Sequence, residues 1–153
     1  MSEELTEAGA TALAAALRAE HAAVWTYELV TAFVSRPQVR SAVAEATGVH
    51  EGHRDEAQRL IRATGATPPA ASPAYSLPQP MTDEGSAIAV LIIAEQECQV
   101  GWRSVLENTE PDGPDPAVRR TALTALTTAA TRATRWRITA GRTPAAEAQP
   151  GKP

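Results

Sequence analysis

His50-Glu51-Gly52-His53 lies at the middle of a helix predicted over residues 37–63, and the other predicted helices must be arranged around it. Alternate steps of four and three residues through this segment trace one face of an α-helix. That face consists of Val39, Val43, Ala46, His50, His53, Ala57 and Leu60. Two imidazoles on an otherwise apolar face need partners for their ring nitrogens, so other helices must bring polar groups to the same depth.

Length and composition indicate one helical domain. The chain has 153 residues, aromatic residues make up 4% of it, and alanine and threonine are abundant. Such a composition favours tightly packed helices with small side chains over a β-rich core. The net charge of −4 argues against the basic face that nucleic-acid binding requires, so we expect no nucleic-acid partner.

We also expect a cytoplasmic protein that does not enter a membrane. The most apolar stretch, residues 87–94, is far too short to span a bilayer. The first residues, Ser2-Glu3-Glu4, are acidic where a secretory signal is basic. Cys98 is the single cysteine, so the chain forms no internal disulfide, in agreement with a reducing compartment.

Capping residues and prolines mark three further helices. The first runs from Ser2 or Thr6 to about residue 35, the third from Thr82 to about residue 107, and the fourth from Asp115-Pro116 to Gly141. The second helix is capped by Gly65. Gly48 and Gly52 inside it indicate either a close approach of another helix or a break in the helix.

Carboxylates interrupt the core faces of two of these helices at mid-length. The face of the first helix is Leu13, Leu17, Glu20, Val24, Tyr27, Thr31 and Val34, and that of the third is Ile88, Leu91, Glu95, Cys98, Trp102 and Val105. The fourth helix presents Val118, Ala122, Leu126, Ala129, Ala133 and Trp136, with no carboxylate or imidazole. In an aligned bundle Glu20, Glu95 and the two histidines would share one layer.

The connection over residues 64–81 decides how the helices are ordered. Its five prolines favour extended polyproline conformation. At about 3.1 Å per residue it covers roughly 50 Å, whereas a helix of this kind is about 40 Å long. It can therefore return along the whole bundle and deliver the third helix parallel to the second. We predict an all-α, up-down-down-up four-helix bundle over residues 1–142, followed by a disordered tail over residues 143–153.

The shared layer resembles the ferritin-like superfamily. In its di-iron members, helices 1 and 3 each give a glutamate, and helices 2 and 4 each give Glu-x-x-His. The resemblance places Glu20 and Glu95 at the two lone glutamates and His53 at the histidine of helix 2. His50 stands where that motif has a glutamate, and the fourth helix has no Glu-x-x-His.

A wider resemblance covers most of residues 10 to 144. It rests on Ala19-Glu20-His21-Ala22, on Arg54-Asp55 after the histidines, and on Tyr75-Ser76-Leu77-Pro78 in the proline-rich connection. These segments are similar to an uncharacterised ferritin-like family, a domain of unknown function, of high-GC Gram-positive bacteria. The resemblance brings no known activity with it.

Two hypotheses follow for the layer. Glu20, His50, His53 and Glu95 form a ligand set for one Fe²⁺, Mn²⁺ or Zn²⁺, whose charge would cancel that of the two carboxylates. A second metal lacks bridging carboxylates from the fourth helix, so we expect neither ferroxidase activity nor iron storage. Alternatively, two pairs of glutamate with protonated histidine would neutralise the layer without a metal, as the remnant of an ancestral site.

Other side chains have two interpretations each. Cys98 is either a thiolate ligand or a small core side chain. His21, Trp25 and Leu29 form either a dimer-facing strip or the closed edge of the bundle. The four arginines 132, 135, 137 and 142 near the end of the fourth helix form either a small anion site or a solvated face, and we expect the solvated face. The functional hypotheses are thus a single-metal protein, or a non-catalytic bundle that acts as a homodimer or binds a protein partner; no catalytic residue is assigned.

Overall fold

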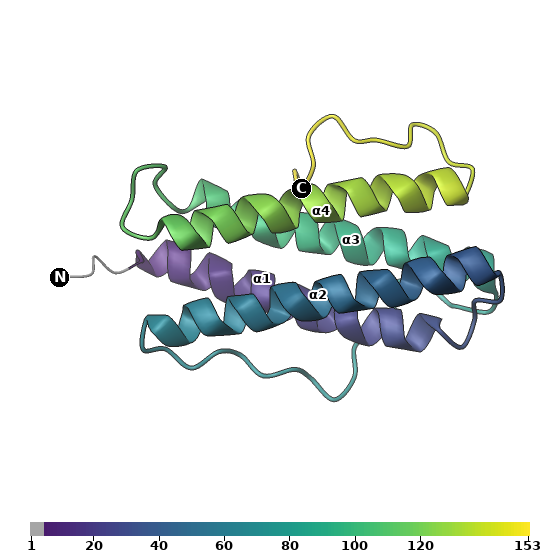
Figure 1. The fold of residues 1–153 in the computed structure, drawn as a ribbon, viewed down its shortest axis with the longest axis horizontal. Coiled ribbons are helices and arrows are strands. Elements are labelled where there is room, and N and C mark those ends of the chain that lie inside the picture. The colour runs from purple at the N-terminus through teal and green to yellow at the C-terminus, as the bar shows by residue number, and fades with distance from the viewer. Residues whose placement is uncertain (1–4) are drawn as a thin grey trace.

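The computed structural model describes residues 5–153, and its four helices form a bundle (Figure 1). The helices are α1 (Glu7–Val30), α2 (Pro37–Ala63), α3 (Glu84–Glu107) and α4 (Pro116–Thr139). Helices α1 and α4 run in one direction, and α2 and α3 run in the other. The described residues contain no strand, and the predicted all-α, up-down-down-up bundle is confirmed.

The helices begin at side chains that accept hydrogen bonds from free backbone amides. Thr6 caps α1, and the alternative cap, Ser2, lies outside the described residues. The sequence predicts Thr82 as the cap of α3, but the helix is capped by Asp83. The reason is a capping box, in which Asp83 accepts from the amide of Ser86 and the Ser86 side chain accepts from the amide of Asp83.

The two glycines inside α2 do not mark a close helix contact. Helix α2 is continuous through Gly48 and Gly52, and a Cβ atom added at either position would meet nothing within 4 Å. The close approach lies elsewhere, at Gly101 of α3. A Cβ atom there would lie 3.0 Å from the Cα of Ala16 on α1, so these two helices touch through their backbones.

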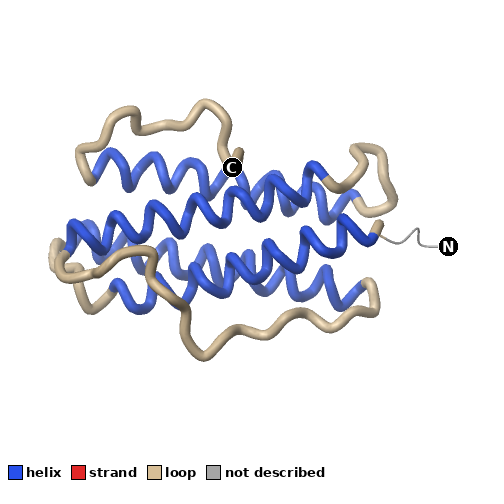
Figure 2. The backbone as a smooth tube through the Cα atoms, turned by 180° about the vertical axis from the view of Figure 1, so that it is seen from behind, coloured by secondary structure: helices blue, strands red, loops and turns tan. Residues whose placement is uncertain are grey.

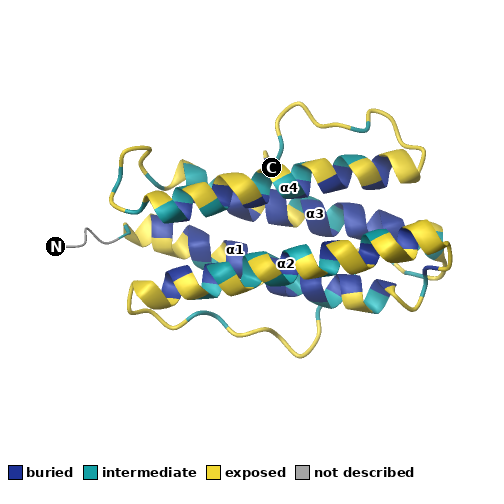
Figure 3. Cartoon of the chain, in the orientation of Figure 1, coloured by how far each residue is buried: buried dark blue, intermediate teal, exposed yellow. Residues whose placement is uncertain are grey.

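The apolar core is divided into two clusters by a polar layer. One cluster gathers Leu13, Leu17, Leu60 and Trp102 near one end of the bundle, and the other gathers Val30, Val43, Leu91 and Trp136 near the opposite end. The buried faces of the helices point inward along the whole bundle (Figure 3). Helix α2 packs closely on α1 but sparsely on α4, which leaves a groove between α2 and α4.

The proline-rich connection returns along the outer side of α1 (Figure 2). The Nε2 atom of His21 lies 3.1 Å from the carbonyl oxygen of Pro69, and the rings of Trp25 and Tyr75 are 5.7 Å apart. Trp25 and Leu29 are half-buried. His21 and Trp25 lie beneath this connection, at one edge of the bundle.

Residues 143–153, whose composition predicts disorder, run back along α3 and α4, and the chain ends near the middle of α4 (Figure 1). This segment is held by polar contacts rather than by apolar burial. The guanidinium of Arg137 donates to Glu147 at 2.7 Å, and the amide of Gln96 donates to the same oxygen at 2.9 Å.

No helix within residues 5–153 has both the length and the hydrophobicity required to cross a membrane.

Candidate functional site

Three helices bring polar side chains together in the layer between the two apolar clusters. The Nδ1 atom of His50 lies 2.6 Å from Oε2 of Glu20, and its Nε2 atom lies 2.9 Å from Oε1 of Glu95. None of the three residues is more than 2% exposed. The imidazole of α2 therefore bridges a carboxylate of α1 and a carboxylate of α3, and both of its ring nitrogens are used.

His53, one turn further along α2, takes a different position. Its Nδ1 atom is 3.7 Å from Oε1 of Glu20, and its side chain is 17% exposed. It lines the groove of about 430 Å³ between α2 and α4, beside Glu56, Arg59 and Arg120. His53 thus connects this open groove with the buried layer, at the edge of the network rather than inside it.

Three aromatic side chains add hydrogen bonds to the layer. The hydroxyl of Tyr27 donates to Oε1 of Glu95 at 2.6 Å and accepts from Nε1 of Trp136 at 2.7 Å. The Nε1 atom of Trp102 donates to Oε1 of Glu20 at 2.7 Å. The sequence pattern placed all three residues on apolar faces but not in this network, because it used their hydrophobic rings and not their polar atoms.

Helix α4 contributes a cation to the layer. Arg132 is 7% exposed, its Nε atom lies 3.8 Å from Oε1 of Glu95, and its Nη2 atom lies 3.8 Å from Oε1 of Glu45. The expectation that the arginines near the end of α4 are solvated is therefore wrong for Arg132. It is also wrong for Arg137, which is equally buried. The burial of Arg132 is explained by the charge of Glu95 beside it, and not by the helix dipole alone.

The hydrogen bonds of His50 determine its protonation. Burial by itself lowers the pKa of His50, but the neighbouring sulfur of Cys98 and the hydrogen bonds with Glu20 and Glu95 outweigh burial and hold the pKa well above the usual value. His50 is therefore an imidazolium at neutral pH. Together with the guanidinium of Arg132 it gives two positive charges against the two carboxylates, so the layer is neutral.

His53 does not supply the second cation. Burial lowers the pKa of His53, and the charge of His50 contributes to the same direction, while Glu20 acts against it. A neutral His53 fits its position beside a protonated neighbour. The metal-free hypothesis therefore needs a correction: one glutamate–histidine pair and one glutamate–arginine pair balance the layer, instead of two histidine pairs.

Cys98 lies next to these groups and is fully buried. One ligand atom each from Glu20, His50 and Cys98 lie within 4.8 Å of one another, so this buried cluster can hold a metal ion. The Sγ atom of Cys98 lies 3.6 Å from the carbonyl oxygen of Ala19. Burial, together with the charge of Glu20, raises the pKa of the thiol strongly, so Cys98 is a neutral core side chain in this arrangement.

Three buried polar atoms of the described chain have no hydrogen-bond partner. They are Oε2 of Glu95, Nε2 of Gln99 and Nε of Arg132. Glu95 and Arg132 belong to the layer, and Gln99 lies one turn after Glu95 on α3, so each of these buried groups keeps unused hydrogen-bonding capacity.

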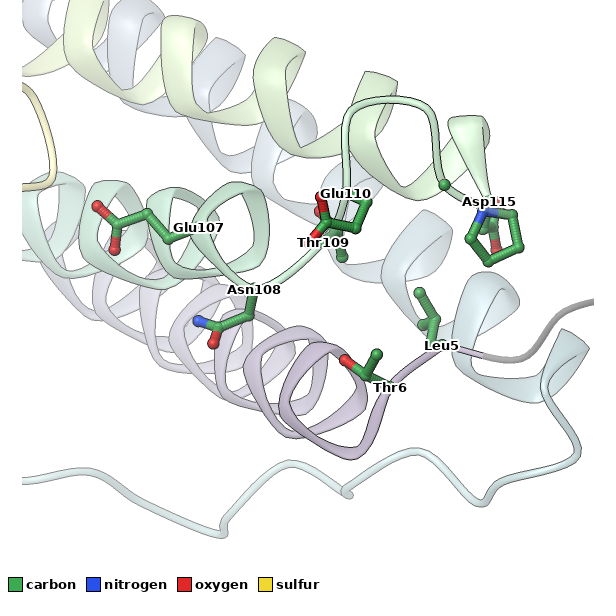
Figure 4. Close-up of a pocket in the computed structure, with 9 residues that line it drawn as sticks. Leu5, Thr6, Glu107, Asn108, Thr109, Glu110 and Asp115 are labelled. Atoms are coloured by element: carbon green, nitrogen blue, oxygen red, sulfur yellow. The ribbon is translucent and has the colours of Figure 1, made fainter.

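A separate pocket of about 170 Å³ lies at the end of the bundle where α1 begins and α3 ends (Figure 4). Leu5 and Thr6 lie beside the loop that carries Thr109, Glu110 and Asp115. No unpaired buried polar atom of the described residues lines this pocket. We assign no chemistry to it.

The comparisons with known proteins agree with this architecture. The chain is similar to the crystal structure of a conserved hypothetical protein, rv2844, from Mycobacterium tuberculosis, with a TM-score of 0.81 and 34% sequence identity. The similarity covers 88% of this chain and 98% of that one. No curated protein matches the chain. Residues 12–153 match the model of a domain of unknown function, DUF4439, and the chain therefore belongs to this family.

Proposed function

We propose that this chain is a non-catalytic helical bundle whose buried ionic network needs no metal and whose role is exercised through binding. One observation carries the proposal: both ring nitrogens of His50 are bonded to carboxylates, Glu20 on one side and Glu95 on the other. A metal ion would need one of these nitrogens, and one of the two short contacts would have to break. The hydrogen bonds of His50 to Glu20 and Glu95 therefore use the ring nitrogens that a metal ion would need.

The charges support the same conclusion. A divalent ion stabilises a cluster of carboxylates by cancelling their charge. Here the imidazolium of His50 and the guanidinium of Arg132 already give that compensation to Glu20 and Glu95. An added ion would meet a layer that is already neutral, so it would gain little electrostatic energy and would have to displace a proton from His50.

Unfolding measured with and without metal tests this proposal. Protein treated with a chelator should have the same urea midpoint as protein given Mn²⁺, Zn²⁺ or, without oxygen, Fe²⁺. A ligand at 100 times its Kd stabilises the native state by about 2.7 kcal/mol. A shift of that size with any of the three ions would contradict the proposal.

A second candidate, a single divalent ion on Glu20, His50 and Cys98, is favoured by the short separation of their ligand atoms. Glu95 contacts His50 and His53 contacts Glu20, so both lie at the edge of this group. Elemental analysis of untagged protein, repeated on the Glu20→Ala, His53→Ala variant, tests this candidate. It predicts one ion in the unaltered protein and none in the variant, whereas equal and negligible metal in both would remove it.

A homodimer is the simplest form of a binding role. Trp25 and Leu29 keep part of their apolar surface exposed, although Trp25 packs on Tyr75 of the connection, and we expect this remaining surface at such an interface. Light scattering on the full chain should give the mass of a dimer. A monomer at high concentration would contradict self-association and would direct the search to a different protein partner.

A further inference from the structure

A second polar site lies on the outer face of α3 and α4, away from the buried layer. Arg137 is 7% exposed, yet its guanidinium contacts, within residues 5–153, are made to the segment that follows α4. Its Nη1 atom donates to the carbonyl oxygen of Ala145 at 3.2 Å, and its Nη2 atom donates to Oε1 of Glu147 at 2.7 Å. A buried guanidinium thus depends on a flanking segment for its counter-charge.

The site already holds a carboxylate. Oε1 of Glu147 accepts from Arg137 and also from Nε2 of Gln96 on α3, at 2.9 Å. Two donors from two helices therefore converge on one carboxylate oxygen. Arginine is well suited to such a site, because its planar donors match carboxylate geometry.

The segment that supplies Glu147 is weakly attached. Residues 143–151, here called the C-terminal strap, contain no large apolar side chain. Besides the contacts of Glu147 and Ala145, the strap accepts one hydrogen bond from Arg103, to the carbonyl oxygen of Pro150 at 3.2 Å. Glu147 is itself more than one-third exposed, and ion pairs of this kind contribute little to stability.

Gly151 fixes where the end of the strap lies. Its φ of +77° is left-handed, and a Cβ atom there would lie 2.4 Å from the carbonyl oxygen of Gln99. The strap therefore lies directly on the backbone of α3. The match to the family model extends to residue 153, so the strap is part of the family's domain.

A pocket of about 210 Å³ lies under the strap. It is lined by Gln99, Ala130, Thr131, Thr134, Arg137, Ala146, Glu147 and Pro150. Gln99 is 1% exposed, and its amide nitrogen is one of the buried donors without a partner. The pocket thus combines a cation, hydroxyl and amide groups, and more space than the Glu147 carboxylate fills.

We propose that Arg137 and Gln96 form a binding site for a small organic carboxylate, and that Glu147 of the strap is a tethered occupant that such a ligand replaces. Exchange of one carboxylate for another keeps the charge of Arg137 compensated. The middle of the strap around Glu147 would move aside as the ligand enters, because that part is held by the same two donors, while Gly151 keeps the end of the strap on α3. This inference is independent of the proposal for the buried layer.

The experiment uses the full chain and its Glu147→Gln variant, titrated with sodium acetate and sodium succinate and observed by backbone amide NMR. Sodium chloride and inorganic phosphate at equal ionic strength are the controls. The variant should bind succinate several-fold more tightly than the unaltered chain, because the internal competitor is gone, with shifts centred on Gln96 and Arg137. No saturable shift of the variant below about 50 mM would overturn the proposal.

Matched variants in the Glu147→Gln background assign the binding to this site. Arg137→Gln should weaken carboxylate binding at least tenfold, whereas Arg135→Gln, the same change at an exposed position of α4, should leave it unaltered. If Arg137→Gln does not fold, Gln96→Leu at a half-buried position tests the second donor. Equal loss from Arg135→Gln, or equal binding of chloride, phosphate and carboxylates, would show an unspecific anion effect and overturn the proposal.

Discussion

The Nε atom of Arg132 lies 3.8 Å from Oε1 of Glu95, so the helix that brings no carboxylate to the buried layer brings a cation to it. Glu95 is fully buried and also receives the hydroxyl of Tyr27 and the imidazolium of His50. The α4 guanidinium and the α2 imidazolium together balance the two acids of α1 and α3. The four helices are thereby joined at mid-length by charge as well as by packing.

Replacing His50 with glutamine should destabilise the fold strongly. The substitution leaves Glu20 and Glu95 buried without the cation between them, and removal of one partner of a buried ion pair costs about 3–5 kcal/mol. Urea unfolding monitored by circular dichroism measures the loss. His53→Gln, a matched change at the edge of the layer, should cost less than about 1 kcal/mol. Equal losses of unfolding free energy from the two variants would show that the contacts of His50 with Glu20 and Glu95 contribute no more to stability than the contact of His53 with Glu20.

The stability contributed by His50 should decrease as the pH rises. Its pKa in the folded protein is above the unfolded value of about 6.5. Its contribution is therefore complete below about pH 6.5 and is lost as the pH passes through the folded pKa. The difference in unfolding free energy between the parent chain and His50→Gln should shrink from pH 6 to pH 9.

His53 should show the opposite slope, which makes it a control for the pH experiment. Its pKa is lowered on folding, so protonation favours the unfolded state, and the chain gains stability from this residue as the pH rises through the unfolded value. Measuring the pH series in a His53→Gln background isolates the His50 contribution. A difference that grows with pH in that background would contradict the assignment of an imidazolium.

Replacing Arg132 with methionine should destabilise the protein by about 1–3 kcal/mol, because it removes one of the cations beside a buried carboxylate while keeping most of the side-chain volume. Thermal unfolding at low and high salt measures the effect. Because the pair is buried, the loss should persist in 1 M NaCl. Arg135→Met, at an exposed position, should change the midpoint little at either salt concentration.

Replacing Tyr27 with phenylalanine should cost about 1–3 kcal/mol. The hydroxyl donates to Glu95 and accepts from Trp136, so its loss leaves two buried polar groups short of a partner. Urea unfolding gives the energy, and the fluorescence of Trp136 reports the local change. A variant as stable as the parent chain would indicate that water replaces the hydroxyl without cost.

The sequence contains enough information to predict the helices and the depth of three of the central polar groups. Carboxylates on two core faces and an imidazole on a third stand out against apolar neighbours, and helix geometry then requires them to meet. Glu20, His50 and Glu95 do so. The period of a helix does not specify which way a side chain leans within its layer, so the peripheral place of His53 was not predictable.

Arg132 could have been found from its spacing. It lies between Ala129 and Trp136 at the intervals that define the core face of α4, just as Gln99 does between Glu95 and Trp102 on α3. The position of Arg132 near the end of a helix with several arginines favoured the solvated interpretation instead. The path of residues 143–153 had no comparable signal, because single polar contacts position this segment and composition does not encode them.

Gly101 has a consequence for the buried charges, although it makes no contact with them. Because it lacks a side chain, the backbones of α1 and α3 touch there, one turn before Glu20 along α1. Gly101 also directly precedes Trp102, whose indole donates to Glu20. A methyl group at this position would push its neighbour away by a few tenths of an ångström. The spacing of α1 and α3, which allows the single imidazole of His50 to reach the carboxylates of both helices, therefore depends on a glycine at position 101.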